Sequence, residues 1–92
     1  MAHIERDQVK LLHRVRRIRG QVNAIERAIR DHDPCGELLQ LIAAARGALN
    51  GLMSEVVDGH VRFHVVDPHE NPRSPRSRAA QELLDVLKRY MK

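Results

Sequence analysis

Apolar residues recur at alternating steps of four and three along two long stretches of the chain, and this spacing limits the fold more than any other feature. Apolar residues spaced in this way lie along one side of a helix and form the seam of coiled-coil-like packing. The first stretch covers about residues 7–31 and carries Leu11, Val15, Ile18, Val22, Ile25 and Ile29. The second covers about residues 34–66 and carries Leu38, Ile42, Ala45, Leu49, Leu52, Val56, Gly59 and Phe63. The spacing predicts two long helices.

Breaks in the pattern separate these helices from each other and from a third. Residues 31–34 interrupt the first seam, and Pro34 suits the first turn of the second helix. Residues 67–77 contain three prolines and predict a loop. The apolar residues after the loop predict a last helix over about residues 77–91, and no segment has the pattern of a strand. We therefore expect a single all-α domain over residues 1–92 with three helices.

The second helix has more apolar surface than the other two helices can cover. Beside its main seam it carries a further apolar stripe formed by Leu41, Ala44 and Ala48. A helix that is apolar on most sides lies at the centre of its bundle. A chain of 92 residues buries only a thin core by itself. The excess apolar surface therefore predicts a subunit interface.

Positive charge is concentrated at the start of the chain. Residues 1–30 contain eight Lys and Arg against three Asp and Glu, whereas residues 37–66 contain two against three. The chain has one Phe, one Tyr and no Trp, which argues against single-stranded nucleic acid because its bases stack on aromatic side chains. A duplex is bound through its phosphates and groove edges. We expect double-stranded DNA to be contacted by Lys10, Arg14, Arg16, Arg17 and Arg19, which lie with Gln21 along and beside one face of the first helix.

Several features predict a cytoplasmic protein that does not enter a membrane. The N-terminal residues are polar and charged, unlike a signal peptide. No apolar run approaches the roughly 20 residues needed to span a bilayer. The single cysteine, Cys35, cannot form a disulfide within the chain, which fits a reducing compartment.

One cysteine and two histidines share a face of the second helix. His60 and His64 are four residues apart and can bind one metal ion together. Cys35 lies within about 20° of both around the helix axis. Along a continuous helix, however, Cys35 and His60 are about 38 Å apart, whereas metal–ligand bonds are only about 2.0–2.3 Å long. One chain therefore cannot bring the thiol and the imidazoles to one ion.

Two copies of the second helix packed antiparallel solve this problem. If the copies pair about residue 48, Cys35 of one lies opposite position 61 of the other. We therefore expect two equivalent sites per dimer, each with Cys35 from one protomer and His60 and His64 from its partner. The same face carries an apolar seam for the dimer, interrupted by Arg46 and formed by Leu38, Leu39, Ile42, Leu49, Met53, Val56 and Val57.

The string RVRRIRGQVNAIERAIRDHDPCGELLQLIAAARGALNGLMSEVVDGHVRFHV closely resembles a family of all-helical repressors. This family includes copper-sensing CsoR, nickel/cobalt-sensing RcnR and formaldehyde-sensing FrmR. The resemblance is strong over about residues 1–66 and looser in the last helix. It implies a three-helix protomer, an antiparallel four-helix-bundle dimer and a tetramer built as a dimer of dimers. It also implies binding to operator DNA without a helix-turn-helix, and release of the DNA when an effector binds.

The nickel/cobalt branch resembles this chain at His3, Cys35, His60 and His64, and there the N-terminal amine also contributes. One thiolate with three imidazoles suits Ni(II) or Co(II) better than Cu(I). The resemblance to the copper sensors is weaker, because they have a second cysteine at position 64. The resemblance to the formaldehyde sensors is weaker at two positions. They have proline at position 2 and a non-histidine residue, commonly acidic, at position 64, whereas this chain has Ala2 and His64.

We therefore predict a repressor that Ni(II) or Co(II) releases from its operator, and that controls metal-efflux genes. Formaldehyde is the main alternative effector, since one carbon could bridge the Cys35 thiol and the amine of Ala2; a Cu(I)- or Zn(II)-responsive member is another. An enzyme is not expected, because no carboxylate is positioned as a base beside the histidine pair. No organic cofactor is expected, and no metal role is assigned to His13, His32 or His69. A nucleoid-type structural protein would explain the arginines but not the phased cysteine and histidines.

Overall fold

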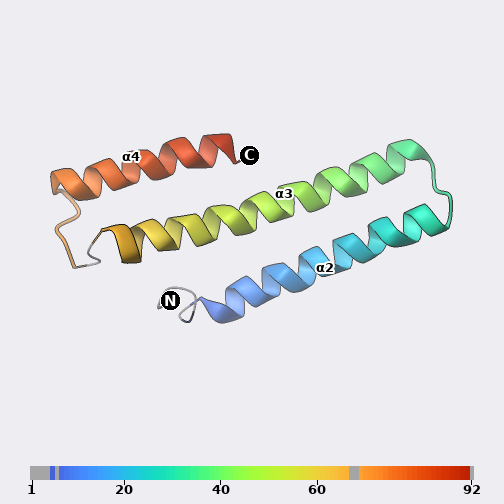
Figure 1. Cartoon of the computed structure of the whole chain (residues 1–92), viewed down its shortest axis with the longest axis horizontal. Helices are drawn as coiled ribbons and strands as arrows, with labels where there is room; N and C mark the ends of the chain where they lie inside the picture. Colours follow the sequence, from blue (N-terminus) through green and yellow to red (C-terminus); the bar gives the residue numbers. More distant parts are fainter. Residues whose placement is uncertain (1–4, 6, 67–68, 92) are drawn as a thin grey trace.

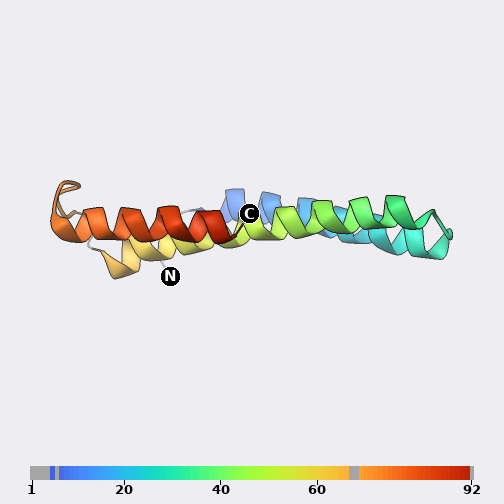
Figure 2. The ribbon, with the colours of Figure 1, turned by 90° about the horizontal axis from the view of Figure 1, so that it is seen from above.

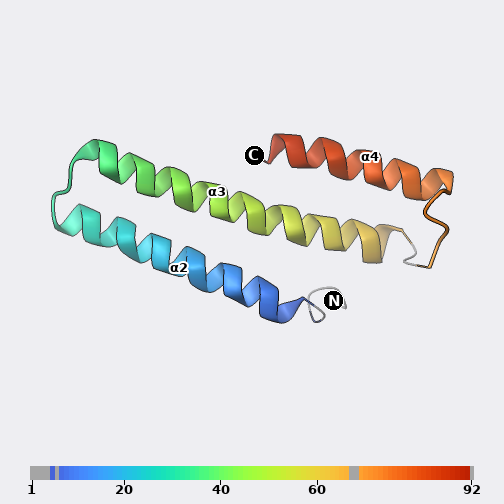
Figure 3. The ribbon, with the colours of Figure 1, turned by 180° about the vertical axis from the view of Figure 1, so that it is seen from behind.

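The computed structural model describes residue 5, residues 7–66 and residues 69–91. They form α2 (Gln8–Arg30), α3 (Cys35–His60), the π-helical turn η1 (Val61–Val65) and α4 (Pro75–Tyr90), and no strand occurs among them. α3 lies between α2 and α4 and runs antiparallel to both, and α4 covers only the second half of α3 (Figures 1 and 3). The predicted all-α fold with three helices is confirmed. None of the described helices is long and apolar enough to span a membrane.

A tight turn sets α2 and α3 antiparallel. His32 has a φ of 53°, the left-handed conformation that ends many helices. The backbone N–H of Asp33 then donates to the carbonyl of Ala28 at 3.0 Å. Pro34 follows in an extended conformation, and α3 begins at the next residue. The predicted break at residues 31–34 is therefore a compact hairpin connection.

The second helix ends differently from the prediction. An uninterrupted helix was expected to about residue 66, but the α-helical part ends at His60 and the last five residues wind as η1. The backbone N–H of Val66 donates to the carbonyl of Val61, five residues earlier, at 3.0 Å. Wider turns of this kind occur at helix C-termini. Here Pro68 follows in the sequence, and a proline disfavours helical backbone in the residue before it.

The last helix begins earlier than predicted, at Pro75 rather than at about residue 77. The Oγ of Ser74 accepts a hydrogen bond from the backbone N–H of Ser77 at 3.1 Å and so caps the first turn. Pro75 stands at the first helical positions, where its missing N–H removes no hydrogen bond. The sequence prediction treated this proline as part of the loop and therefore placed the boundary too late.

The chain forms a single layer of helices. Its extents are 55 × 25 × 12 Å, and the shortest is about the diameter of one helix with its side chains (Figure 2). Its radius of gyration is 17.2 Å, whereas a compact domain of this length has one of about 12 Å. It exposes 7150 Å², against about 5,400 Å² for a compact monomer of this mass. Both broad faces of the layer are therefore open.

The apolar seam predicted for the first helix is only partly buried. Ile18 is 8% exposed, and Leu11 and Ile25, seven residues away on either side, are half-buried. The alternate seam residues Val15, Val22 and Ile29 are exposed, Val22 by 49%. On the other side of α3, Leu84 of α4 is 2% exposed, the lowest exposure among the buried apolar residues of the described chain. One chain therefore covers only half of the α2 seam.

Candidate functional site

A groove with basic walls runs between α2 and α3. Its volume is about 610 Å³, and α3 contributes only the small side chains of Ala44 and Ala48 to its lining. The remaining lining comes from α2, namely Lys10, His13, Arg14, Arg17, Ile18 and Gln21. Three of the five predicted DNA-contacting residues thus line one groove, because residues three and four apart share a face of a helix.

Two of these cations contact the same carboxylate on α3. The Arg14 Nη2 donates to Oε1 of Glu55 at 2.7 Å, and the Lys10 Nζ lies 3.3 Å from the same oxygen. Burial acts to raise the pKa of Glu55, but the hydrogen bonds and charges of Arg14 and Lys10 outweigh it and lower the pKa below its ordinary value. Glu55 is therefore ionised near neutral pH and partly neutralises both cations.

Gly51 makes room for the Arg14 side chain on α3. A Cβ at Gly51 would lie 3.3 Å from Nη1 of Arg14, closer than nine in ten such contacts. Gly51 also lies one helical turn before Glu55, so the guanidinium group crosses α3 at the glycine and reaches the carboxylate. The sequence prediction did not pair Glu55 with these cations. The hairpin register could have found the pair, because residues equally distant from the turn at 31–34 lie opposite each other.

Lys10 and Arg14 pair with Glu55, but the remaining three predicted DNA-contacting residues have no acidic partner among the described residues. Arg16, Arg17 and Arg19 are exposed, and none forms an ion pair with another described residue. Gln21, beside Arg17 in the groove, has a buried Oε1 without a hydrogen-bond partner in the described part of the chain. The groove therefore presents positive charge and one unused acceptor.

The predicted metal ligands lie at opposite ends of α3. Cys35 is the first residue of α3, is exposed and is a free thiol. His60 is the last residue of α3 and His64 lies in η1, with the two ring centroids 5.4 Å apart and the rings tilted by 36°. The structure thus brings the two histidines together and leaves the cysteine at the other end of α3, whose two ends are far apart (Figure 1). The fourth candidate, His3, lies outside the described residues.

No group of three or more His, Cys, Asp or Glu side chains among the described residues could hold a metal ion within one chain. An exposed stripe nevertheless connects the candidates along α3. Its residues repeat at steps of three, four and seven, and are Cys35, Leu39, Ile42, Arg46, Leu49, Met53, His60 and His64. All eight residues are exposed, and their spacing is that of one helix face.

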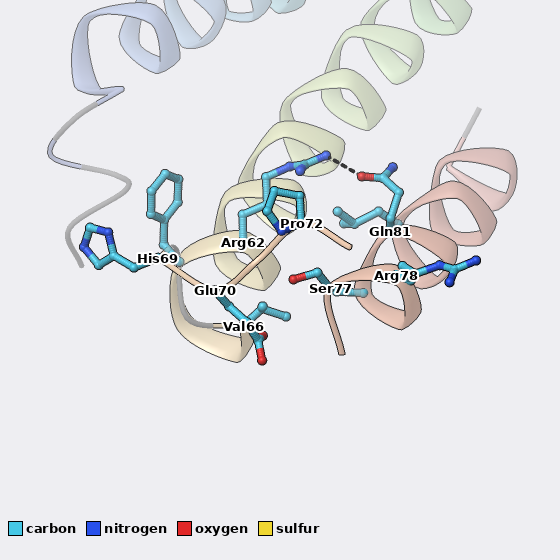
Figure 4. A pocket seen from close by; sticks show the side chains of 11 residues that line it. Arg62, Val66, His69, Glu70, Pro72, Ser77, Arg78 and Gln81 are labelled. Carbon is cyan, nitrogen blue, oxygen red and sulfur yellow. Dashed lines mark hydrogen bonds between the residues drawn. The ribbon is translucent and has the colours of Figure 1, made fainter. Parts of the chain in front are cut away.

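Polar contacts hold α4 against the histidine end of α3. Asp58 accepts from Nε of Arg62 at 2.8 Å, and the Lys88 Nζ of α4 lies 3.4 Å from the same carboxylate. The Nη2 of Arg62 donates to Oε1 of Gln81 at 3.0 Å (Figure 4). The sequence prediction missed this network, although Asp58 and Arg62 are four residues apart, the spacing of a helical ion pair.

A separate hollow of about 650 Å³ opens between η1, the loop and α4. Figure 4 shows Arg62, Val66, His69 and Glu70 on one side of it and the α4 residues on the other. One carboxylate oxygen of Glu70 is buried without a hydrogen-bond partner in the part of the chain that the structure describes. The hollow is lined by none of the predicted metal ligands or DNA-contacting residues.

Known proteins place the chain in a family. Residues 7–89 match the family model described as metal-sensitive transcriptional repressor. The transcriptional repressor RcnR of Salmonella paratyphi B is 41% identical over 92 residues, which cover the whole of both chains. An uncharacterized protein from the bioA 5' region of Serratia marcescens is 50% identical over the same complete length.

A solved structure is similar as well. It is the formaldehyde-responsive regulator FrmR of Salmonella enterica serovar Typhimurium, in a variant with a glutamate-to-histidine substitution. It matches 95% of this chain and 96% of its own with a TM-score of 0.65 and 44% identity. The expectation that the chain is not an enzyme is confirmed, because the matching family model and RcnR are of transcriptional repressors. The chain therefore belongs to the CsoR/RcnR family of metal-sensitive transcriptional repressors.

Proposed function

We propose that this repressor is cytoplasmic, binds double-stranded operator DNA through the basic face of α2 and is released by Ni(II) or Co(II), so that it controls metal-efflux genes. The cations that would contact phosphate are Lys10, Arg14, Arg16, Arg17 and Arg19. Their support is the basic groove together with the three arginines that have no acidic partner among the described residues.

The observation that carries the metal proposal is the exposed stripe along α3. Cys35 stands at one end and the His60–His64 pair at the other, with apolar side chains and Arg46 between them. An antiparallel second copy on this stripe would bring the thiol of each chain to the histidine pair of the other. Burial of the exposed Ile42, Leu49 and Met53 side chains would stabilise that dimer. Two such dimers would form the tetramer.

The donor set fits a borderline metal ion. Cys35 of one protomer, with His60 and His64 of the other and with His3 and the N-terminal amine, would provide one sulfur and several nitrogens. Imidazole nitrogen suits nickel and related ions, whereas soft thiolate sets select Cu(I). A bound ion would cross-link the two protomers at each end of the stripe. A Zn(II)- or Cu(I)-responsive member would use the same residues.

Formaldehyde is the second candidate effector, favoured by the 44% identity to the formaldehyde-responsive regulator and by the exposed Cys35 thiol. The thiol sulfur and the N-terminal amine nitrogen would each bond to the formaldehyde carbon, and its oxygen would leave as water. The product is an S–CH₂–N bridge. It consumes no oxidant and adds the mass of one carbon atom to the protein.

Fluorescence anisotropy of a labelled duplex taken from upstream of the gene tests both candidates. The apo protein is expected to bind it, and stoichiometric Ni(II) or Co(II) to weaken binding by roughly 5- to 150-fold, the usual range of allosteric coupling. Parallel titrations use Zn(II), Cu(I) and formaldehyde. Release by formaldehyde alone, with the corresponding mass shift on the Cys35 peptide, would replace the metal proposal by the alternative. His60→Ala is expected to lose release by metal. His32→Asn is its control, because it removes an exposed histidine of the turn between α2 and α3 that lies outside both the ligand set and the basic groove.

A further inference from the structure

We propose that the Glu55 carboxylate competes with DNA phosphate for Lys10 and Arg14, so that the position of α3 against α2 sets how many cations the repressor offers to DNA. This inference rests on the proposed DNA-binding function and adds to it a residue that acts against binding.

The contacts at Glu55 are those that a phosphate would make. One carboxylate oxygen lies 2.7 Å from Nη2 of Arg14 and 3.3 Å from Nζ of Lys10. A phosphate oxygen uses the same charged N–H donors at the same distances. A donor held by the carboxylate is therefore only partly free for DNA, and binding a phosphate requires that contact to weaken or break.

The exposure of the three side chains allows this exchange. The Lys10 side chain is 68% exposed and that of Arg14 is 41% exposed, whereas the Glu55 side chain is only 25% exposed. The carboxylate thus lies deeper between the helices, and the cations extend from it toward the open face. A phosphate can reach both cations from the solvent side without displacing Glu55 from the protein.

The backbone of α3 connects this contact to the histidine end of the helix. Glu55 and His60 belong to one uninterrupted α-helix, five residues apart, so they move as one body. Asp58, between them, holds this end of α3 to α4 through Lys88. A shift of the His60 end of α3 against α2 therefore changes the separation of Glu55 from Lys10 and Arg14.

The test compares Glu55→Gln with Glu37→Gln in the full-length protein. Both variants remove one negative charge from α3, but Glu37 lies in its first turn and forms no ion pair with a described residue. Anisotropy measures binding to the upstream duplex and to a random duplex from about 50 to 200 mM salt. Glu55→Gln is expected to bind both about tenfold more tightly at about 100 mM salt, with a steeper salt dependence because more phosphates are contacted. Glu37→Gln should change affinity less than twofold.

Three results for the variants would overturn the inference. If both variants bound DNA equally more tightly, the change in net charge alone would explain the effect of Glu55→Gln. Unchanged binding by Glu55→Gln would show no competition, and weaker binding would show that Glu55 positions the cations for DNA. If the wild-type protein binds neither duplex, the proposed function fails, and the inference fails with it.

A second measurement needs no variant. The wild-type carboxyl groups are titrated by carbon NMR with and without the duplex, with Glu37 as internal reference. If DNA draws Lys10 and Arg14 away, the pKa of Glu55 rises on binding by more than that of Glu37. An equal or absent change would contradict competition even if Glu55→Gln did not fold.

Discussion

At the scale of single residues, the cations of α2 fall into two groups. Lys10 and Arg14 share the carboxylate of Glu55, whereas Arg17, in the same groove, contacts no acid among the described residues. From the sequence, all of them belong to one basic stripe. The position of a residue around the helix axis predicts the direction of its side chain but not which side chain of another helix it contacts. Their contributions to DNA binding should therefore differ.

Arg17→Ala is expected to weaken DNA binding and to flatten its salt dependence. Each lost phosphate contact lowers the slope of log K against log salt by about 0.9. Arg30→Ala is the matched control, since Arg30 is on the same helix but is paired with Glu26 in the last turn. Anisotropy over a salt series measures both. An equal change of slope in the two variants would mean that Arg17 acts only through net charge.

Glu55→Gln is expected to lower the free energy of unfolding by about 1 kcal/mol at pH 7, the size of a partly exposed charged contact. The folded-state pKa of Glu55 is lowered, so its contribution is complete above the unfolded-state pKa of about 4.3 and is lost as the pH falls through the folded-state value. Urea unfolding of both proteins at a series of pH values checks this. A difference that grows toward acid pH would contradict the sign.

At the scale of elements, the structure differs from the prediction at the ends of helices and agrees with it along their centres. The long seams correctly predicted where helices exist. The end of α3 as a π turn and the start of α4 at a capped proline depend on one or two hydrogen bonds each. One of these ends carries a predicted metal ligand, since His64 lies in η1, which begins directly after α3.

Ser74→Ala is expected to destabilise the protein by about 1 kcal/mol, because the backbone N–H of Ser77 loses its acceptor. Ser77→Ala is the control, as it removes a hydroxyl from the same turn and leaves that N–H in place. Thermal unfolding followed by circular dichroism measures both variants. If the two variants are equally stable, the Ser74 cap contributes nothing.

At the scale of the whole molecule, the chain is a single layer with two unlike faces. Lys10, Arg14 and Arg17 line a groove on one face, while the exposed stripe from Cys35 to His64 runs along α3. A layer 12 Å thick cannot bury its apolar residues on both sides. This shape is expected to require a second layer, which the proposed antiparallel dimer provides.

A mixture of two inactive variants tests whether the metal site is shared. Cys35→Ser lacks the thiol and His60→Ala lacks an imidazole, so neither homodimer has a complete site. In a mixed dimer, Cys35 from one chain and His60 from the other restore one of the two sites. After mixing and subunit exchange, the thiolate-to-Co(II) absorption is expected to return. Each heterodimer should show roughly half of the absorption of a wild-type dimer. Absorption that never returns would place each site within one chain.

The sequence by itself determined the helices, the turn between α2 and α3, and the phase that puts Cys35, His60 and His64 on one face. These follow from local periodicity, from the proline and from the geometry of a regular helix. It also determined that one chain could not bring the thiol to the imidazoles, because this is a matter of helix length. The membership of the chain in its family followed from the same motifs.

The tertiary structure decided what depends on contacts between helices. The pairing of Glu55 with Lys10 and Arg14 requires the register of the α2–α3 hairpin and the space left by Gly51, neither of which a single helix specifies. The exposure of Val15, Val22 and Ile29 likewise depends on how α3 covers α2. The seam was predicted as one apolar stripe, but a neighbouring helix of limited width can bury only one side of it.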